Sequence, residues 1–188
     1  AGEADGPVLA PMAAARAESG SMTPGRGATG LPLTNFARQM ICDPKFREFW
    51  RVPVLVRESA GQGGEGAEVT LPGVAPTGPR AGEPRVFEAR KAPDTMNVLL
   101  GIMLGRTSNN DIVINDVSGS RFHAVLVQDE KAGGWSIGDA GSSNGTFVRG
   151  ERLKALVRVP LGEDEPIALG TVLLRFLSPP AFFRYLET

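Results

Sequence analysis

Short apolar runs alternate with turn residues along the second half of the chain. Gly, Asn, Asp and Pro separate these runs, for example at 109–111, 131–134 and 144–145. Many short strands at close spacing, with turns between them, are typical of an antiparallel β-sandwich or barrel. We therefore predict an all-β domain over residues 85–178. The strands are expected at 85–90, 97–104, 112–114, 122–128, 135–138, 146–148, 153–159, 165–169 and 172–177.

The first part of the chain follows a different pattern. Residues 1–30 are mostly Ala, Gly, Pro, Ser and Thr and include no aromatic residue. Such a segment buries too little apolar surface to offset its ordering entropy, which predicts a disordered leader. Residues 31–58 predict short helices and a strand at 52–57 that pack on the domain as an extension. Pro53 is expected to place that strand at a sheet edge.

Two further segments complete the predicted organisation. Residues 59–84 are rich in Gly and Pro and predict a linker or a long loop. At the other end, Pro179 and Pro180 precede several large apolar side chains. Residues 179–188 therefore predict a short C-terminal helix that packs on the domain.

Composition restricts the chemistry. The chain of 188 residues has 24 Gly and 15 Pro, which argues against a helical bundle. It has one His and one Cys, too few for a four-ligand structural zinc site or an internal disulfide. With 20 basic and 21 acidic residues, it lacks the basic excess of nucleic-acid and membrane binders. The sequence also shows no apolar run long enough to span a membrane and no signal peptide, so we expect a cytoplasmic protein.

Three polar segments between predicted strands are not explained by core packing: 104–111, 116–124 and 139–147. Loops gather at the two ends of a sandwich, so these segments could share one surface. They would bring together two guanidiniums, several hydroxyls and a carboxamide, a set that suits a phosphate group. The carboxylates of Asp111, Asp116 and Asp139 would then face away.

The same segments offer no catalytic machinery. A Ser–His or Cys–His pair would have to use His123, which we expect to be buried. Nothing else supplies a nucleophile with an activating base, a metal site or a cofactor site. The chemistry therefore indicates recognition and not turnover, and we expect no enzyme activity and no cofactor.

The three segments resemble the motifs of forkhead-associated (FHA) domains. The family pattern is Gly-Arg at a strand end, then Ser-x-x-His, then Gly-Ser-x-Asn-Gly-Thr. This chain has Gly105-Arg106, Ser120-Arg121-Phe122-His123 and Gly141-Ser142-Ser143-Asn144-Gly145-Thr146, in that order. The resemblance covers roughly residues 85–177. It implies a β-sandwich, of bacterial type and with an N-terminal extension, that binds phosphothreonine peptides.

The resemblance also implies roles for individual residues. Arg106 would grip the phosphate, and Ser120 would bond a phosphate oxygen with Arg121 beside it. Ser143 would line the phosphothreonine pocket. Asn144 would hold the main chain of the ligand.

Supporting roles fall to three residues of the same motifs. His123 would brace the loop that carries Ser120, while Gly105 and Gly145 would shape the backbone of the site. One position departs from the family: Gly119 stands where Val is common before the Ser. A Gly there removes an apolar anchor and would loosen the loop, which puts the affinity in doubt.

The implied partner is a phosphothreonine-containing protein, a substrate of a Ser/Thr kinase. Two rival functions stay open at this point: a phosphate-independent interaction or oligomerisation module on the same fold, and a hydrolase that uses His123. The leader also contains Thr23-Pro24 and Thr29. If a kinase modifies one of them, the domain could bind its own leader or that of a second copy.

Overall fold

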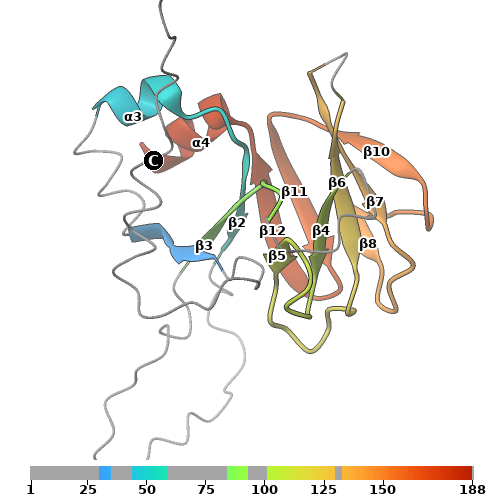
Figure 1. Cartoon of the computed structure of the whole chain (residues 1–188). Helices are drawn as coiled ribbons and strands as arrows, with labels where there is room; N and C mark the ends of the chain where they lie inside the picture. Colours follow the sequence, from blue (N-terminus) through green and yellow to red (C-terminus); the bar gives the residue numbers. More distant parts are fainter. Residues whose placement is uncertain (1–29, 35–43, 59–83, 93–100, 130–132, 188) are drawn as a thin grey trace, which may run out of the picture.

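The computed structural model describes residues 30–34, 44–58, 84–92, 101–129 and 133–187. These residues form two β-sheets that face each other, with a short helix at the C-terminal end (Figure 1). The predicted all-β sandwich and C-terminal helix are confirmed. The predicted leader at 1–30 (apart from Gly30) and nearly all of the predicted linker at 59–84 lie outside the described residues. No helix in the described part of the chain is both long and apolar enough to cross a membrane.

The larger sheet has seven strands, all paired antiparallel. In spatial order they are β1 (Leu31–Pro32), β3 (Arg85–Glu88), β2 (Val54–Arg57), β12 (Val172–Leu177), β11 (Asp164–Leu169), β8 (Thr146–Val148) and β9 (Glu151–Arg152).

The smaller sheet has five strands. In spatial order they are β10 (Arg158–Leu161), β7 (Trp135–Asp139), β6 (Ala124–Gln128), β4 (Ile102–Gly105) and β5 (Ile112–Val113). The pairing of β4 with β5 is parallel, so this sheet departs from the purely antiparallel sandwich that we expected.

Strand β2 lies inside the larger sheet, between β3 and β12. The expectation that Pro53 places this strand at an edge is therefore wrong. Pro53 precedes the first paired residue, Val54, so its missing N–H removes no bond from the ladder. Instead, the Pro53 carbonyl accepts a hydrogen bond from the backbone N–H of Ala89 at 2.9 Å.

Two apolar clusters stabilise the fold. The main cluster fills the space between the sheets and includes Leu55, Leu104, Leu126 and Phe176. A second cluster lies on the other face of β2, β3 and β12. It contains Trp50, Val54, Val56, Val86, Leu177, Ala181 and Phe182. Because Val54, Leu55 and Val56 of β2 are buried although they point to alternate faces, this part of the strand is continuously apolar and does not alternate.

Two helices accompany the second cluster. Helix α4 (Pro179–Leu186) begins at Ser178, whose hydroxyl accepts a hydrogen bond from the backbone N–H of Ala181. Its Phe182 is fully buried. Helix α3 (Pro44–Phe49) lies close to α4 in Figure 1, and Arg47 pairs with Glu187 at 2.9 Å.

Most predicted strands agree with the structure to within a few residues, and those at 146–148 and 172–177 coincide with β8 and β12. The prediction at 153–159 is wrong. Residues 153–157 lie outside the strands, and β10 covers only Arg158–Leu161. Leu156 adopts a left-handed backbone conformation with φ of 64° and is 85% exposed. This apolar residue is therefore not part of the buried strand that the prediction assumed.

Candidate functional site

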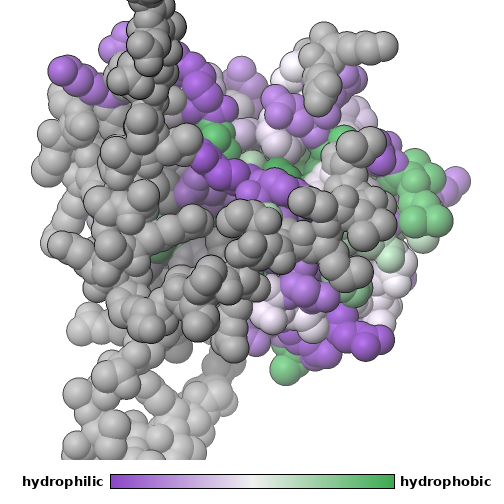
Figure 2. Space-filling view, viewed as in Figure 1, coloured by the Kyte–Doolittle hydropathy of each residue, from purple (hydrophilic) through white to green (hydrophobic). Residues whose placement is uncertain are grey.

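Three loops meet at the end of the sandwich that lies away from α3 and α4 (Figure 1). They follow β4, join β5 to β6, and join β7 to β8. Ser120 connects all three. Its carbonyl accepts a hydrogen bond from the backbone N–H of Arg106, and its hydroxyl accepts one from the backbone N–H of Ser143, both at 2.9 Å. This end is mostly hydrophilic or neutral in the space-filling view (Figure 2).

Arg106 is the first residue after β4, and its side chain is exposed. Within the described residues, its guanidinium makes neither an ion pair nor a hydrogen bond. Arg121, on the next loop, is also exposed and free of such a partner. The two guanidiniums that the sequence singles out are therefore available to an anion from outside.

Gly105 allows two loops to approach each other closely. A Cβ on Gly105 would collide with the backbone carbonyl of Arg121 and would lie 2.9 Å from Nδ2 of Asn110. The backbone φ of Gly105 is not in the left-handed region, so its conformation alone does not require glycine. The close contact with the Arg121 carbonyl does. The close approach sets the position of Arg106 relative to Arg121.

His123 is fully buried between two of the loops. Its Nδ1 accepts a hydrogen bond from the backbone N–H of Ser120, and its Nε2 donates to the carbonyl of Gly145, both at 3.0 Å. The ring thus carries its proton on Nε2. Both nitrogens bond to the backbone, and neither faces a nucleophile or solvent, which gives no support to a hydrolase.

Asn144 and Gly145 form the tip of the β7–β8 loop. The side-chain N–H of Asn144 donates a hydrogen bond to the carbonyl of Ser118 at 2.8 Å, and Asn144 is nevertheless exposed to solvent. Gly145 has φ of 85°, a conformation that other residues adopt only with strain. Its N–H donates to the hydroxyl of Ser142 at 2.9 Å. The turn is therefore fixed before any ligand arrives.

Asp139 organises the β7–β8 loop from within. Its carboxylate accepts hydrogen bonds from the backbone N–H groups of Gly141 and Ser142 and from the hydroxyls of Ser142 and Thr146, at 2.6–2.9 Å. Burial raises the pKa of this carboxyl, but these four bonds outweigh burial and hold the pKa below its usual range. The carboxylate is therefore directed into the loop and away from the surface.

Asp116 has the same role in the β5–β6 loop. It accepts hydrogen bonds from the N–H and hydroxyl of Ser118 and pairs with Arg57 of β2 at 3.0 Å. Burial raises its pKa, but the Ser118 bonds and the Arg57 charge lower the pKa overall. The third carboxylate, Asp111, is buried and binds Lys91 at 2.9 Å. All three carboxylates thus have partners within the protein.

Two residues that sequence reasoning did not single out also hold the site. Asn110 is fully buried, and its Nδ2 donates to the carbonyl of Arg121 at 2.7 Å. Thr107 donates to the same carbonyl through its hydroxyl at 3.1 Å. Their only sequence signal is polarity in a turn, which does not reveal that the side chains point inward.

Arg149 lies at the other end of β8 from Asn144 and binds Glu165 with two hydrogen bonds, at 2.7 and 2.6 Å. Gly119 is buried, and a Cβ there would lie 3.2 Å from the Asp116 carbonyl and 3.9 Å from Cβ of Arg106. The loop is held by Asp116, whose carbonyl accepts a hydrogen bond from the Gly119 N–H at 3.1 Å and whose carboxylate accepts bonds from Ser118.

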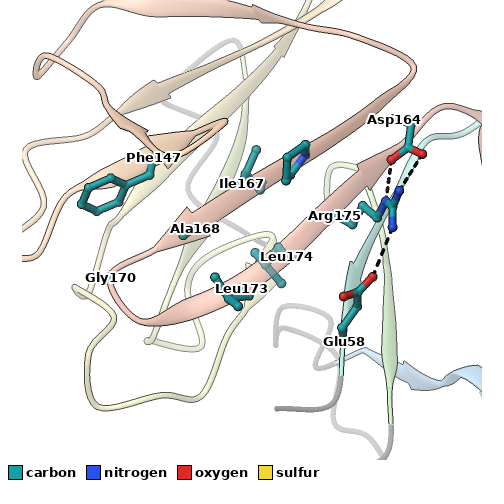
Figure 3. A pocket seen from close by; sticks show the side chains of 11 residues that line it. Glu58, Phe147, Asp164, Ile167, Ala168, Gly170, Leu173, Leu174 and Arg175 are labelled. Carbon is teal, nitrogen blue, oxygen red and sulfur yellow. Dashed lines mark hydrogen bonds and ion pairs between the residues drawn. The ribbon is translucent and has the colours of Figure 1, made fainter. Parts of the chain in front are cut away.

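A pocket of about 620 Å³ lies on the outward face of β8, β11 and β12 (Figure 3). Phe147, Leu173 and Ala168 contribute apolar surface. At one end, Arg175 bridges Asp164 and Glu58, at 2.6 and 3.5 Å. The pocket contains none of the residues that the motifs predict.

Comparisons with known proteins agree with the motifs. The model of the FHA domain family matches residues 102–170. The chain is 41% identical over 75 residues to the ABC transporter ATP-binding/permease protein Rv1747 of Mycobacterium tuberculosis, a match that covers 40% of this chain and 8% of that protein. It is 32% identical over 69 residues to the FHA domain-containing protein FhaB of the same organism, covering 37% of this chain and 42% of that protein.

The chain thus spans less than half of the length of these curated relatives. Among solved structures, that of Mycobacterium tuberculosis Rv1747 FHA-1 aligns with a TM-score of 0.41 and 20% identity, over 69% of this chain and 98% of that one. The resemblance drawn from the three motifs is confirmed by the family match: the chain contains an FHA domain, which the match places at residues 102–170.

Proposed function

We propose that this chain binds phosphothreonine-containing peptides at the end of the sandwich where the three loops meet, and that it acts as a signalling module without catalysing a reaction. One observation carries the proposal. Arg106 and Arg121 are exposed and have no anionic partner within the described residues, whereas the three neighbouring carboxylates are held by donors of the protein itself. The site therefore presents uncompensated positive charge.

Each residue of the site has a role that its contacts allow. Arg106 donates two parallel hydrogen bonds to phosphate oxygens. The hydroxyl of Ser120 already accepts a bond from the Ser143 N–H, so its own hydrogen is available to the phosphate. Arg121 adds positive charge beside Ser120, and the exposed hydroxyl of Ser143 lines the proposed phosphothreonine site.

The remaining residues fix the peptide and the loops. Asn144 uses one amide hydrogen for Ser118 and keeps its carbonyl oxygen and second hydrogen for the main chain of the ligand. His123, Gly105 and Gly145 hold the loops in place. Because these groups are arranged before binding, little ordering cost is incurred when the peptide docks.

Titration calorimetry with one peptide in three forms tests the proposal: phosphothreonine, phosphoserine and unphosphorylated threonine. We expect the phosphothreonine form to bind tightest and the unphosphorylated form to show no measurable binding. Arg106→Ala should abolish binding without lowering the melting temperature, because the side chain is exposed and unbonded. Arg184→Ala, on α4 at the other end of the molecule, is the matched control and should bind normally.

Equal affinity for all three forms would reject the phosphate role and favour a phosphate-independent interaction module on the same fold. Normal binding by Arg106→Ala would reject the assignment of Arg106.

The natural ligand is expected to be a Ser/Thr kinase substrate, and the proposal includes the chain's own leader as one source. A synthetic leader peptide phosphorylated on Thr23 or Thr29 should then compete with the test peptide. Failure of both to compete would exclude the leader and leave an external partner.

A further inference from the structure

Arg152 is a cation beside the three loops that the family motifs do not include. It is the last residue of β9 and pairs with Phe147 of β8. A Cβ placed on Gly145 would lie 2.5 Å from Nε of Arg152 and 3.1 Å from its Nη2. Because Gly145 has no side chain, the guanidinium of Arg152 lies directly on the backbone of the loop that carries Asn144.

The guanidinium of Arg152 is exposed and has neither an ion pair nor a hydrogen bond in the part of the chain that the structure describes. Some other exposed arginines, by contrast, have acidic partners. Arg175 binds Asp164 at 2.6 Å, and Arg184 binds Glu163 at 2.9 Å. Arg152 thus shares the unpaired state of the two arginines in the proposed phosphate site.

We propose that Arg152 forms a second anion subsite, which binds an anionic side chain close to the phosphothreonine in the same peptide. This inference rests on the proposed function. A guanidinium binds a carboxylate and a phosphate with the same pair of parallel hydrogen bonds. The anion is therefore either an Asp or Glu side chain or a second phosphorylated residue.

The position of Arg152 sets where that anion stands in the peptide. Asn144 and Gly145 are consecutive, so their Cα atoms are about 3.8 Å apart. If Asn144 holds the ligand's main chain, the peptide passes directly beside the guanidinium over Gly145. An extended peptide advances about 3.3 Å per residue, so a side chain about one to three positions from the phosphothreonine reaches Arg152.

A set of phosphothreonine peptides tests the subsite. Each flanking position in turn carries Gln, Glu or phosphoserine, and affinities are measured for the full chain, for Arg152→Gln and for Arg158→Gln. Arg158 is the matched control. It is also exposed and unpaired among the described residues, but it lies on β10, and its Cγ is 3.3 Å from where a Cβ on Gly138 would be.

We expect Glu or phosphoserine to improve binding about three- to tenfold over Gln at one or two positions. Arg152→Gln should remove this gain, and Arg158→Gln should keep it. A gain with Glu alone identifies a carboxylate ligand, and a gain with phosphoserine alone identifies a second phosphate.

No gain in the unmodified chain, or an equal gain in Arg152→Gln, overturns the subsite while phosphothreonine binding stands. If the phosphorylated and unphosphorylated Gln peptides bind alike, the proposed function itself fails, and the subsite fails with it.

Discussion

At the scale of single residues, the site depends on side chains that never touch the proposed ligand. His123 joins two loops through backbone atoms, and Asp139 accepts four hydrogen bonds within the β7–β8 loop. Gly105 contributes by having no side chain at all. Such residues determine the relative positions of Arg106 and Ser120, so their effect on binding is expected through geometry.

Gly105→Ala tests this geometry. The new Cβ would collide with the Arg121 carbonyl, and the backbone must move. We expect the free energy of unfolding to fall by about 1–3 kcal/mol and phosphopeptide affinity to fall with it. Urea denaturation and calorimetry measure the two effects.

Gly134→Ala is the control, because a Cβ on Gly134 would meet no atom within 4 Å. If both variants were equally stable and bound equally well, the close approach at Gly105 would have no energetic role.

At the scale of elements, β2 is the strand on which the larger sheet depends. Val54, Leu55 and Val56 are all fully buried, and β2 joins β3 to β12. The family match begins only at residue 102, so this strand lies outside it. We propose that the folded unit includes residues 54–57 and does not start at residue 85.

Truncation tests that proposal. A fragment of residues 85–188 would lack β2, which leaves β3 and β12 with unpaired edges and exposes both apolar clusters. We expect it to show no cooperative thermal transition by circular dichroism. A fragment of residues 30–188 should melt cooperatively, like the full chain. A cooperative transition in the shorter fragment, at the same temperature, would contradict the proposal.

These elements also show what the sequence could predict. The short apolar runs identified the strands, because period-two packing and turn residues are local properties. The place of β2 in the sheet was not predictable, because it depends on pairing with Arg175–Leu177, far along the chain. Likewise the motifs identified Arg106, Ser120 and Asn144, whereas Arg152 is brought to Gly145 by the pairing of β9 with β8.

At the scale of the whole molecule, one ion pair connects the larger sheet to the site. Arg57 of β2 pairs with Asp116 of the β5–β6 loop at 3.0 Å, and neither side chain is fully exposed. Asp116 and Asp139 have lowered pKa values, as does Glu165, for which the hydrogen bonds from Arg149 are the first cause. Protonation of Asp116 and Asp139 at low pH therefore weakens both the fold and the hydrogen bonds that hold the β5–β6 and β7–β8 loops.

The pH dependence follows from the sign of these shifts. Each folded-state pKa lies below the unfolded value, so the unfolded chain takes up protons first as the pH falls. The stabilisation is complete above the usual carboxyl values of 3.8 to 4.5 and is lost as the pH falls through the folded-state values. We expect the free energy of unfolding, measured in urea, to decline below about pH 4.

Binding should respond at higher pH than stability, because the phosphate of the ligand takes up its second proton near a pKa of about 6. Calorimetry across the same pH range separates the two effects. Stability that rose on acidification below pH 4 would contradict the assigned role of the three carboxylates.

The long-range pairing of β2 has a consequence for biosynthesis. Val56 pairs with Arg175, which the ribosome adds 119 positions later. At synthesis rates of about 5–20 residues per second, an apolar strand waits roughly 6–24 s for its partner. All three loops of the site are complete before that partner emerges. A nascent chain that already contains every motif residue therefore cannot yet form the finished sandwich, and its capacity to bind is expected to arise only after residues 175–177 have been added and can pair with β2.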